Sequence, residues 1–146
     1  MMEWLGRGGN VVPVATGKHI SLRNAAGVTF VCYEDGGAQA IAIKESVGGA
    51  GEQALGCIDY IYAGDGVGSV LTRETTDANG ALSASSSMVK KDTTAFDMAV
   101  IYVPAEALSE GFDSVECTID GAGICVAIVH DLYTQRAPQN LPAAAV

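Results

Sequence analysis

Two things are scarce in this sequence: positive charge and long apolar runs. Eight Lys and Arg stand against 17 Asp and Glu among 146 residues, so the formal net charge is −9. Proteins that bind nucleic acid cluster their cations to neutralise phosphates, and the only adjacent pair here is Lys90-Lys91. No stretch approaches the roughly 20 consecutive apolar residues of a membrane helix. We therefore expect neither nucleic acid nor a membrane as a direct partner.

Closely paired cysteines and a leader-like start are missing as well. Residues 1–7 include an acid and no apolar core, so we expect no secretory leader and assembly in a cytoplasm. Zinc sites are usually built from closely spaced ligand pairs, which the cysteines do not form. The sequence therefore predicts no metal site and no cofactor, and the thiols are expected to act as small buried hydrophobes. The four cysteines are Cys32, Cys57, Cys117 and Cys125.

No catalytic motif stands out. Residues 64–68, Gly-Asp-Gly-Val-Gly, lack the Lys-Ser/Thr and the helix of a phosphate-binding loop, and we interpret them as a hairpin turn. His130 is the only histidine beside an acid, but no nucleophile is placed with it. We expect His130 and His19 to have hydrogen-bonded structural roles, and we predict that the protein is not an enzyme. Three acids lack the spacing of a calcium loop and are assigned to solvated strand faces and turns: Asp113, Glu116 and Asp120.

The chain does contain many short apolar runs separated by turns. Apolar residues make up 49% of the sequence, and 18 glycines are spread between the runs. This distribution is typical of a folded protein with many turns. The runs give eight or nine short strands, some alternating and some continuously apolar. We predict a single-domain, all-β fold, either a β-sandwich or a small β-barrel.

The turn residues predict two hairpins within this fold. Glycine-rich turns tolerate positive φ and commonly join neighbouring antiparallel strands. On this basis we expect residues 28–33 to pair with residues 39–45, and residues 114–120 to pair with residues 124–132.

Other segments have less regular patterns. Residues 97–103 are continuously apolar, as expected of a strand that is covered on both faces. The Gly-rich segment 46–56 is expected to be a loop with at most one helical turn. Residues 76–91 are small and polar, and we expect them to form the longest loop, with a weak edge strand in its second half.

Both ends of the chain are predicted to be extended arms, so that residues 1–13 and 134–146 flank a β domain of residues 14–133. Prolines in the tail remove backbone donors and fix φ. In the Gly-rich start, Trp4 and Leu5 are expected either to anchor on a neighbouring subunit or to fold back locally. The tail residues that we expect to bind a partner protein are Arg136, Pro138, Leu141 and Pro142.

Two tyrosines form a further candidate binding surface. Tyr60 and Tyr62 are two residues apart on a predicted strand and therefore share a face. Paired tyrosine rings bury a large area at low entropic cost, which suits contact with a sugar or a partner protein. Ordinary packing between neighbouring strands is the alternative.

Three segments carry a resemblance to a known group of proteins. Residues 9–15 (GNVVPVA), 21–31 (SLRNAAGVTFV) and 135–142 (QRAPQNLP) resemble small virion proteins of tailed bacteriophages that accompany major capsid proteins. The likeness covers most of the chain at the level of pattern and includes no catalytic signature. It implies a capsid decoration (cement) protein with a β-rich body and extended arms. Its expected partner is the major capsid protein, and its expected location is the capsid surface, where it forms a homo-oligomer.

Other functions remain open at this point. A phage tail or head–tail junction subunit belongs to the same structural class. A carbohydrate-binding β module would use Tyr60 and Tyr62 as its platform. An enzyme that uses His130 would require a nucleophile brought close by the fold.

Overall fold

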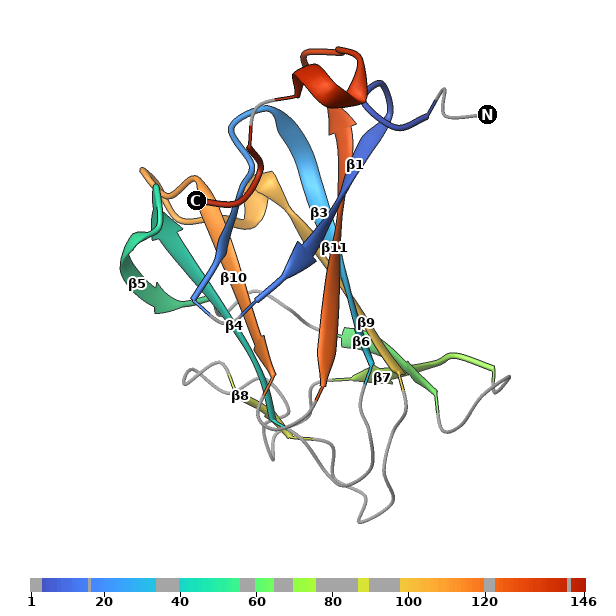
Figure 1. The fold of residues 1–146 in the computed structure, drawn as a ribbon. Coiled ribbons are helices and arrows are strands. Elements are labelled where there is room, and N and C mark those ends of the chain that lie inside the picture. Colours follow the sequence, from blue (N-terminus) through green and yellow to red (C-terminus); the bar gives the residue numbers. More distant parts are fainter. Residues whose placement is uncertain are drawn as a thin grey trace.

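The computed structural model describes residues 4–15, 17–33, 40–55, 60–64, 70–75, 87–89, 98–119, 123–141 and 143–146. In this part of the chain, two antiparallel β-sheets pack against each other (Figure 1). The predicted all-β fold is therefore confirmed, and its architecture is that of a sandwich.

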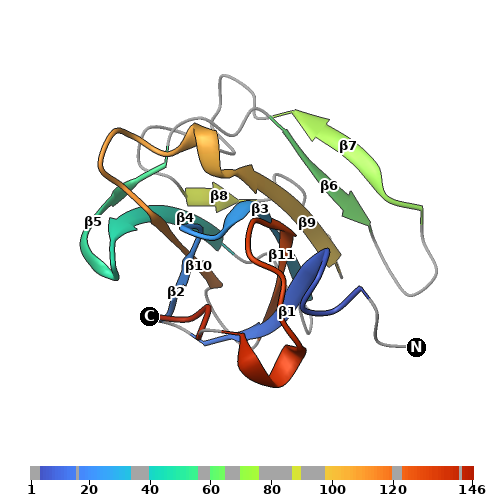
Figure 2. The same cartoon turned by 90° about the horizontal axis from the view of Figure 1, so that it is seen from above.

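The larger sheet has six strands. In spatial order these are β1 (Gly9–Val14), β11 (Ile124–Leu132), β3 (Ala25–Tyr33), β9 (Met98–Pro104), β6 (Tyr60–Gly64) and β7 (Thr72–Thr75). Seen from above, β1 and β7 lie at opposite edges of this sheet (Figure 2).

The smaller sheet has five strands. Four follow one another as β2 (His19–Ser21), β10 (Ser114–Ile119), β4 (Ala40–Val47) and β5 (Ala50–Ala54), and β8 (Ser87–Val89) also pairs with β4. Two short 3₁₀ helices complete the described structure, η1 (Ala105–Ala107) and η2 (Pro138–Asn140). The first of these, η1, follows directly after Pro104.

The core lies between the two sheets and follows from alternation along the strands. Successive side chains of a strand point to opposite faces, so every second residue enters the core. Phe30 of β3 is fully buried there, together with Ile41 and Ile43 of β4 and Val115 of β10. The inner face of β11 contributes Ala127 and other small residues. The sequence pattern therefore identifies most of the core directly.

Both predicted hairpins are wrong, because their strands belong to different sheets. β3 pairs with β9 and β11, whereas β4 pairs with β5, β8 and β10. In the same way, β10 lies in the five-stranded sheet and β11 in the six-stranded sheet. Alternation specifies which residues face inward but not which strand lies alongside. The chain therefore passes from one sheet to the other after β3 and again after β10.

A third turn does close a hairpin. β6 and β7 pair in antiparallel fashion from Tyr60↔Thr75 to Ala63↔Thr72. This pairing confirms the hairpin expected around residues 64–68, although residues 65–69 lie outside the described part. The segment after Ser46 differs from expectation, because residues 50–54 form strand β5 and not a loop or helical turn.

The continuously apolar strand near residue 100 is covered on one face only. Along β9, Ala99, Ile101 and Val103 are buried, but Tyr102 is 52% exposed. The prediction of two covered faces is therefore wrong for a single copy of the described chain.

The predicted N-terminal arm is largely part of the domain. Residues 9–14 form β1, which pairs with β11 from Gly9↔His130 to Val14↔Cys125. Val12 and Val14 pack against the core. Pro13 is compatible with this strand because β1 lies at the edge of the sheet, where a missing N–H donor is tolerated. The boundary drawn after residue 13 is therefore corrected.

The C-terminal segment also lies on its own domain. Its last residues run antiparallel to β2, with a bridge between Ile20 and Ala145 (Figure 2). Ser21 donates its backbone N–H to Ala144, and His19 and Val146 exchange two backbone hydrogen bonds of 3.1 and 2.8 Å. These bonds extend the five-stranded sheet by one short segment. The tail therefore satisfies its backbone groups within the chain.

Candidate functional site

The outer face of the six-stranded sheet is unusually apolar. The pairing of the strands aligns its outward residues in rows across the sheet. One row runs Val11, Ile128, Thr29, Tyr102; the next runs Pro13, Val126, Val31, Val100, Tyr62, Arg73; a third runs Ile124, Tyr33, Met98, Gly64. We call these three rows the outer face. Antiparallel sheets that face water usually carry polar residues there, so this face is atypical.

Several large apolar side chains on the outer face are open to solvent. Ile124 is 65% exposed and Tyr102 52%, and Val11, Tyr33 and Tyr62 each exceed 40%. They come from five of the six strands, so the exposed apolar surface extends across the sheet. Extended apolar surface of this kind marks interaction sites in soluble proteins. The outer face is the strongest candidate functional site in the described part of the chain.

Charge is nearly absent from the outer face. None of its three rows contains an acidic residue, and Arg73 is the only permanently charged member, although the whole chain carries −9. A second acidic protein would be repelled by most of this molecule but not by this face. The distribution of charge therefore favours contact with another protein through the outer face.

Tyr102 is held in place at one side of this face. Its ring lies over Gly27, where an added Cβ would come within 2.9 Å of the ring. The ring also contacts His130 edge-on, with centroids 5.9 Å apart. His130 Nε2 and Thr29 Oγ1 share a hydrogen bond of 2.6 Å, which confirms the hydrogen-bonded role expected for this histidine. A fixed aromatic ring loses little entropy on binding and suits an interface.

The tyrosine pair predicted from sequence contributes to the same face. Tyr62 is 42% exposed and lies between Val100 and Arg73 in the middle row. Tyr60 lies two residues earlier on β6, but its side chain is outside the described part. Sequence reasoning identified Tyr62 but not its neighbours on the other strands, because those neighbours follow from the strand order.

The residues at the start of the chain fold back locally. The Trp4 ring is 49% exposed and lies on the backbone of Gly8 and Gly9, where a Cβ would overlap it. The Trp4 carbonyl accepts backbone hydrogen bonds from Arg7, Gly8 and Gly9. Leu5 is half-buried and forms a bridge with Gly9. Of the two alternatives for this segment, the structure places it in the folded-back arrangement.

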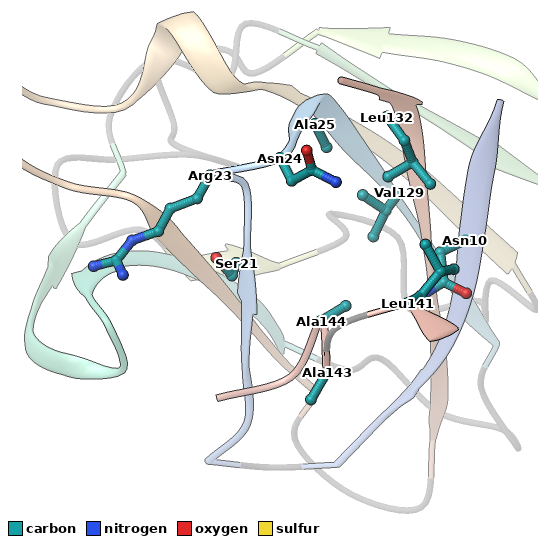
Figure 3. A pocket seen from close by; sticks show the side chains of 10 residues that line it. All are labelled: Asn10, Ser21, Arg23, Asn24, Ala25, Val129, Leu132, Leu141, Ala143 and Ala144. Atoms are coloured by element: carbon teal, nitrogen blue, oxygen red, sulfur yellow. The ribbon is translucent and has the colours of Figure 1, made fainter. Parts of the chain in front are cut away.

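The tail covers a cavity at one end of the sandwich. This cavity of about 200 Å³ has a mostly apolar wall and a few polar groups at its margin (Figure 3). Leu141 forms part of the wall, so this predicted partner-binding residue contacts its own domain. The other lining residues are Asn10, Ser21, Arg23, Asn24, Ala25, Val129, Leu132, Ala143 and Ala144.

The remaining tail residues are placed as follows. Arg136 is exposed, and its backbone N–H donates to the Gly6 carbonyl at 2.8 Å. Pro138 is exposed and begins η2. Pro142 lies outside the described residues. The tail therefore contacts the start of the chain through Arg136 and the end of the sandwich through Leu141.

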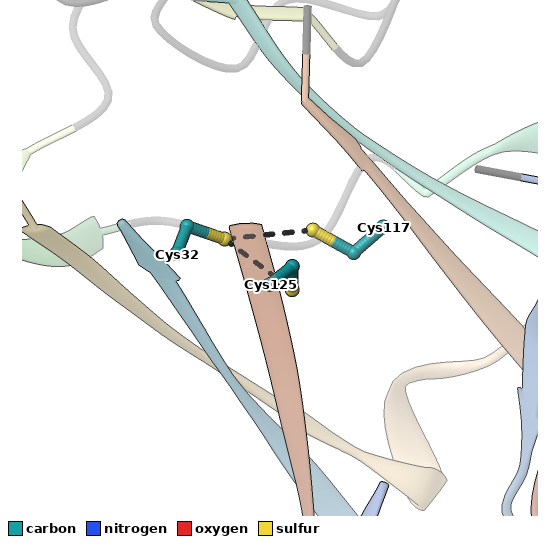
Figure 4. A group of neighbouring side chains, drawn as sticks. All are labelled: Cys32, Cys117 and Cys125. Atoms are coloured by element: carbon teal, nitrogen blue, oxygen red, sulfur yellow. Dashed lines mark hydrogen bonds between the residues drawn. The ribbon is translucent and has the colours of Figure 1, made fainter. Parts of the chain in front are cut away.

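Three cysteines converge inside the core, which the sequence did not predict. Cys32 Sγ lies 3.7 Å from Cys117 Sγ and 3.6 Å from Cys125 Sγ (Figure 4). All three are buried free thiols, as expected of small hydrophobes, while Cys57 lies outside the described residues. The neighbouring Cys125 and Cys32 thiols, together with burial, raise the pKa of Cys117 well above its ordinary value. Cys117 therefore stays protonated near neutral pH and contributes to packing.

Comparison of the chain with protein-family models, with curated proteins and with solved structures finds no match. In the described part of the chain, no helix has the length and apolar character needed to cross a bilayer. The fold and the outer face thus define the class: an all-β sandwich that presents a broad, acid-free apolar face.

Proposed function

We propose that this protein is a non-enzymatic virion structural protein that decorates and stabilises a phage capsid by binding major capsid protein subunits. The observation that carries the proposal is the apolar outer face of the six-stranded sheet. Shell-stabilising proteins act by burying surface across subunit junctions, and symmetric copies convert weak contacts into avidity. An exposed apolar face without acids is suited to that task.

The strand pattern supports the same proposal. β9 and β11 carry apolar residues on both faces. Within the described residues their inward side chains are buried, whereas their outward apolar side chains are half-buried or exposed. Fully burying an exposed Val, Ile or Met side chain is favourable by roughly 1.5–3 kcal/mol, and a partially exposed side chain gains correspondingly less when a partner buries it. A protein partner seated on the outer face supplies that second cover. The outer face, and not either end of the chain, is therefore the proposed contact with the capsid.

Retention on purified capsids tests this proposal. Val11 on the outer face and Val47 at the end of β4 are both strand valines, exposed by 49% and 48%. Val11→Asp places a charge into the proposed interface, and we expect it to lower retention at least tenfold. Val47→Asp is the matched control and leaves retention unchanged. Equal retention of the two variants would contradict the assignment of the face.

A carbohydrate-binding module is the second candidate, and the exposure of Tyr62 favours it. Flat aromatic rings on a sheet can stack on sugars as well as on proteins. Glycan binding by the isolated protein, lost in a Tyr62→Ala variant that still folds, would support this function. Retention on capsids without glycan binding would support decoration. A tail or head–tail junction subunit would use the same face and would be found by its position in the particle.

A further inference from the structure

A second cluster of functional groups lies on the opposite side of the sandwich. The five-stranded sheet brings together His19 of β2, Glu116 of β10 and Glu52 of β5, with Lys44 of β4 beside them. Glu116 pairs with His19 on one side and with Lys44 on the other. One potential ligand atom from each of His19, Glu52 and Glu116 lies within 4.8 Å of the other two.

Glu116 carries the first argument for a ligand at this cluster. Its side chain is buried, with only 3% of the residue exposed. Oε1 accepts a hydrogen bond from the Gly17 N–H at 2.8 Å, but Oε2 accepts none from the described residues. Lys44 Nζ lies 3.7 Å from Oε2, beyond hydrogen-bond distance. A buried carboxylate oxygen without a hydrogen-bond donor is rare, and a bound ion is one arrangement that would satisfy it.

His19 is oriented for coordination. It is 3% exposed, and its Nδ1 shares a hydrogen bond of 2.9 Å with the Ser46 hydroxyl. Metal-binding histidines use such a bond on the second ring nitrogen to fix the ring. Its Nε2 faces Glu52 and lies 3.2 Å from Oε1, so these two atoms already interact in the structure. Ligand atoms that each lie about 2.0 Å from a tetrahedral zinc ion are about 3.3 Å from one another. The distance between His19 Nε2 and Glu52 Oε1 is close to this value.

Charge balance favours a divalent cation. Two carboxylates and a neutral imidazole carry −2, which a divalent ion neutralises completely. In the structure Lys44 supplies a single positive charge, with Nζ 2.9 Å from Glu52 Oε2. The side chains of Lys44 and Glu52 are each 38% exposed, which gives an ion access and lets the lysine swing away.

We propose that His19, Glu52 and Glu116 bind a divalent cation of the zinc class, and that Lys44 is the internal cation that competes with it. One nitrogen and two carboxylate oxygens suit Zn²⁺, whereas Ca²⁺ requires six to eight oxygen ligands. The bound ion joins β2, β10 and β5, and the C-terminal residues pair with β2. The site therefore fastens the tail-bearing edge of the five-stranded sheet and is independent of the outer face.

Calorimetric titration of the metal-free full-length protein with Zn²⁺ tests the proposal. We expect one ion per chain, with affinity lowered at least tenfold by Glu116→Gln and by His19→Gln. Glu106→Gln changes an exposed glutamate of η1 and serves as the matched control, with unchanged affinity.

Lys44→Met supplies the sharper test because it does not rely on a loss of binding. Removing the competing ammonium while keeping the aliphatic stem is expected to tighten Zn²⁺ binding at least threefold. If the cluster is only a network of ion pairs, Lys44→Met will not tighten binding. Absence of stoichiometric binding to the wild-type chain, or equal affinity of wild type, Glu116→Gln and Lys44→Met, would overturn the proposal.

Discussion

The two sheets of this sandwich share one core but present opposite outer surfaces. Outward positions of the six-stranded sheet carry Val, Ile, Met and Tyr, with no acid in the three rows described above. Outward positions of the five-stranded sheet carry His19, Lys44, Glu52 and Glu116, which form ion pairs. Inward and outward residues alternate along the strands of both sheets in the same way. We therefore infer that the two outer surfaces have different roles.

The side chains of the two outer surfaces differ in what they interact with. Charged groups on the five-stranded sheet satisfy one another or, as we propose, a cation, and they need no partner protein. The large apolar side chains on the outer face of the six-stranded sheet are only partly covered by the described residues. Exposed apolar area is stabilised only by burial against another surface. The six-stranded side is therefore the side on which we propose that a partner protein binds.

The largest expected effect comes from the core that both surfaces share. Phe30 is fully buried between the sheets, and Phe30→Ala should lower the free energy of unfolding by about 3–5 kcal/mol through lost burial and a cavity. Urea denaturation measures this change. Val47→Ala, on an exposed side chain, is expected to stay within about 0.5 kcal/mol of wild type. A small effect of Phe30→Ala would mean that the two sheets do not depend on a common core.

A smaller effect is expected at the charged side of the molecule. Asp113 Oδ1 accepts hydrogen bonds from Ser114 Oγ and Gly48 N, and Oδ2 accepts one from Arg23 Nε. The Ser114 hydroxyl first, then the Gly48 N–H and Arg23, hold the pKa of Asp113 below its ordinary 3.8. Because folding lowers the pKa of Asp113, the ionised carboxylate stabilises the fold at pH values above its ordinary pKa. This stabilisation is lost as the pH falls through the pKa of the folded state.

We therefore expect Asp113→Asn to cost about 1–3 kcal/mol of unfolding free energy at pH 7, through lost charge-assisted hydrogen bonds. The difference from wild type should shrink as the pH falls below 3.8, where the native carboxyl is increasingly protonated. Denaturation across this pH range measures it. A difference that stays constant with pH would show that the charge of Asp113 does not contribute. The stability difference between wild type and an uncharged outer-face variant such as Tyr62→Ala should show no such pH dependence.

Much of the fold could be predicted from the sequence, because alternation of apolar residues reports local geometry. It identified the strands around Phe30, Ile41 and Val115 as well as their inward faces. It could not identify strand partners, so β3 with β4 and β10 with β11 were predicted as hairpins. A turn sequence has the same composition whether it joins neighbours in one sheet or crosses between two.

The outer face was partly visible in the sequence. The continuous apolar run of β9 indicated two covered faces, but the described chain covers one of them and leaves Tyr102 on the other 52% exposed. The His19 cluster was not visible, because its members lie 33 and 64 residues apart and meet only through the order of β2, β10, β4 and β5. Glu116 was expected on a solvated face, but it is buried. The contacts among the three core cysteines were not predicted either, because these residues are far apart in the sequence and meet only in the fold.

Tyrosine labelling on the assembled particle tests the central claim most directly. Tyr33, Tyr62 and Tyr102 lie on the outer face, whereas Tyr133 is 69% exposed and lies beyond the end of β11, outside the three rows. Oxidative footprinting of the free protein and of capsids that carry it compares the four rings within one chain. The account predicts that the three outer-face tyrosines become protected on the particle while Tyr133 remains reactive. Labelling of Tyr33, Tyr62 and Tyr102 that is unchanged on the particle would contradict it.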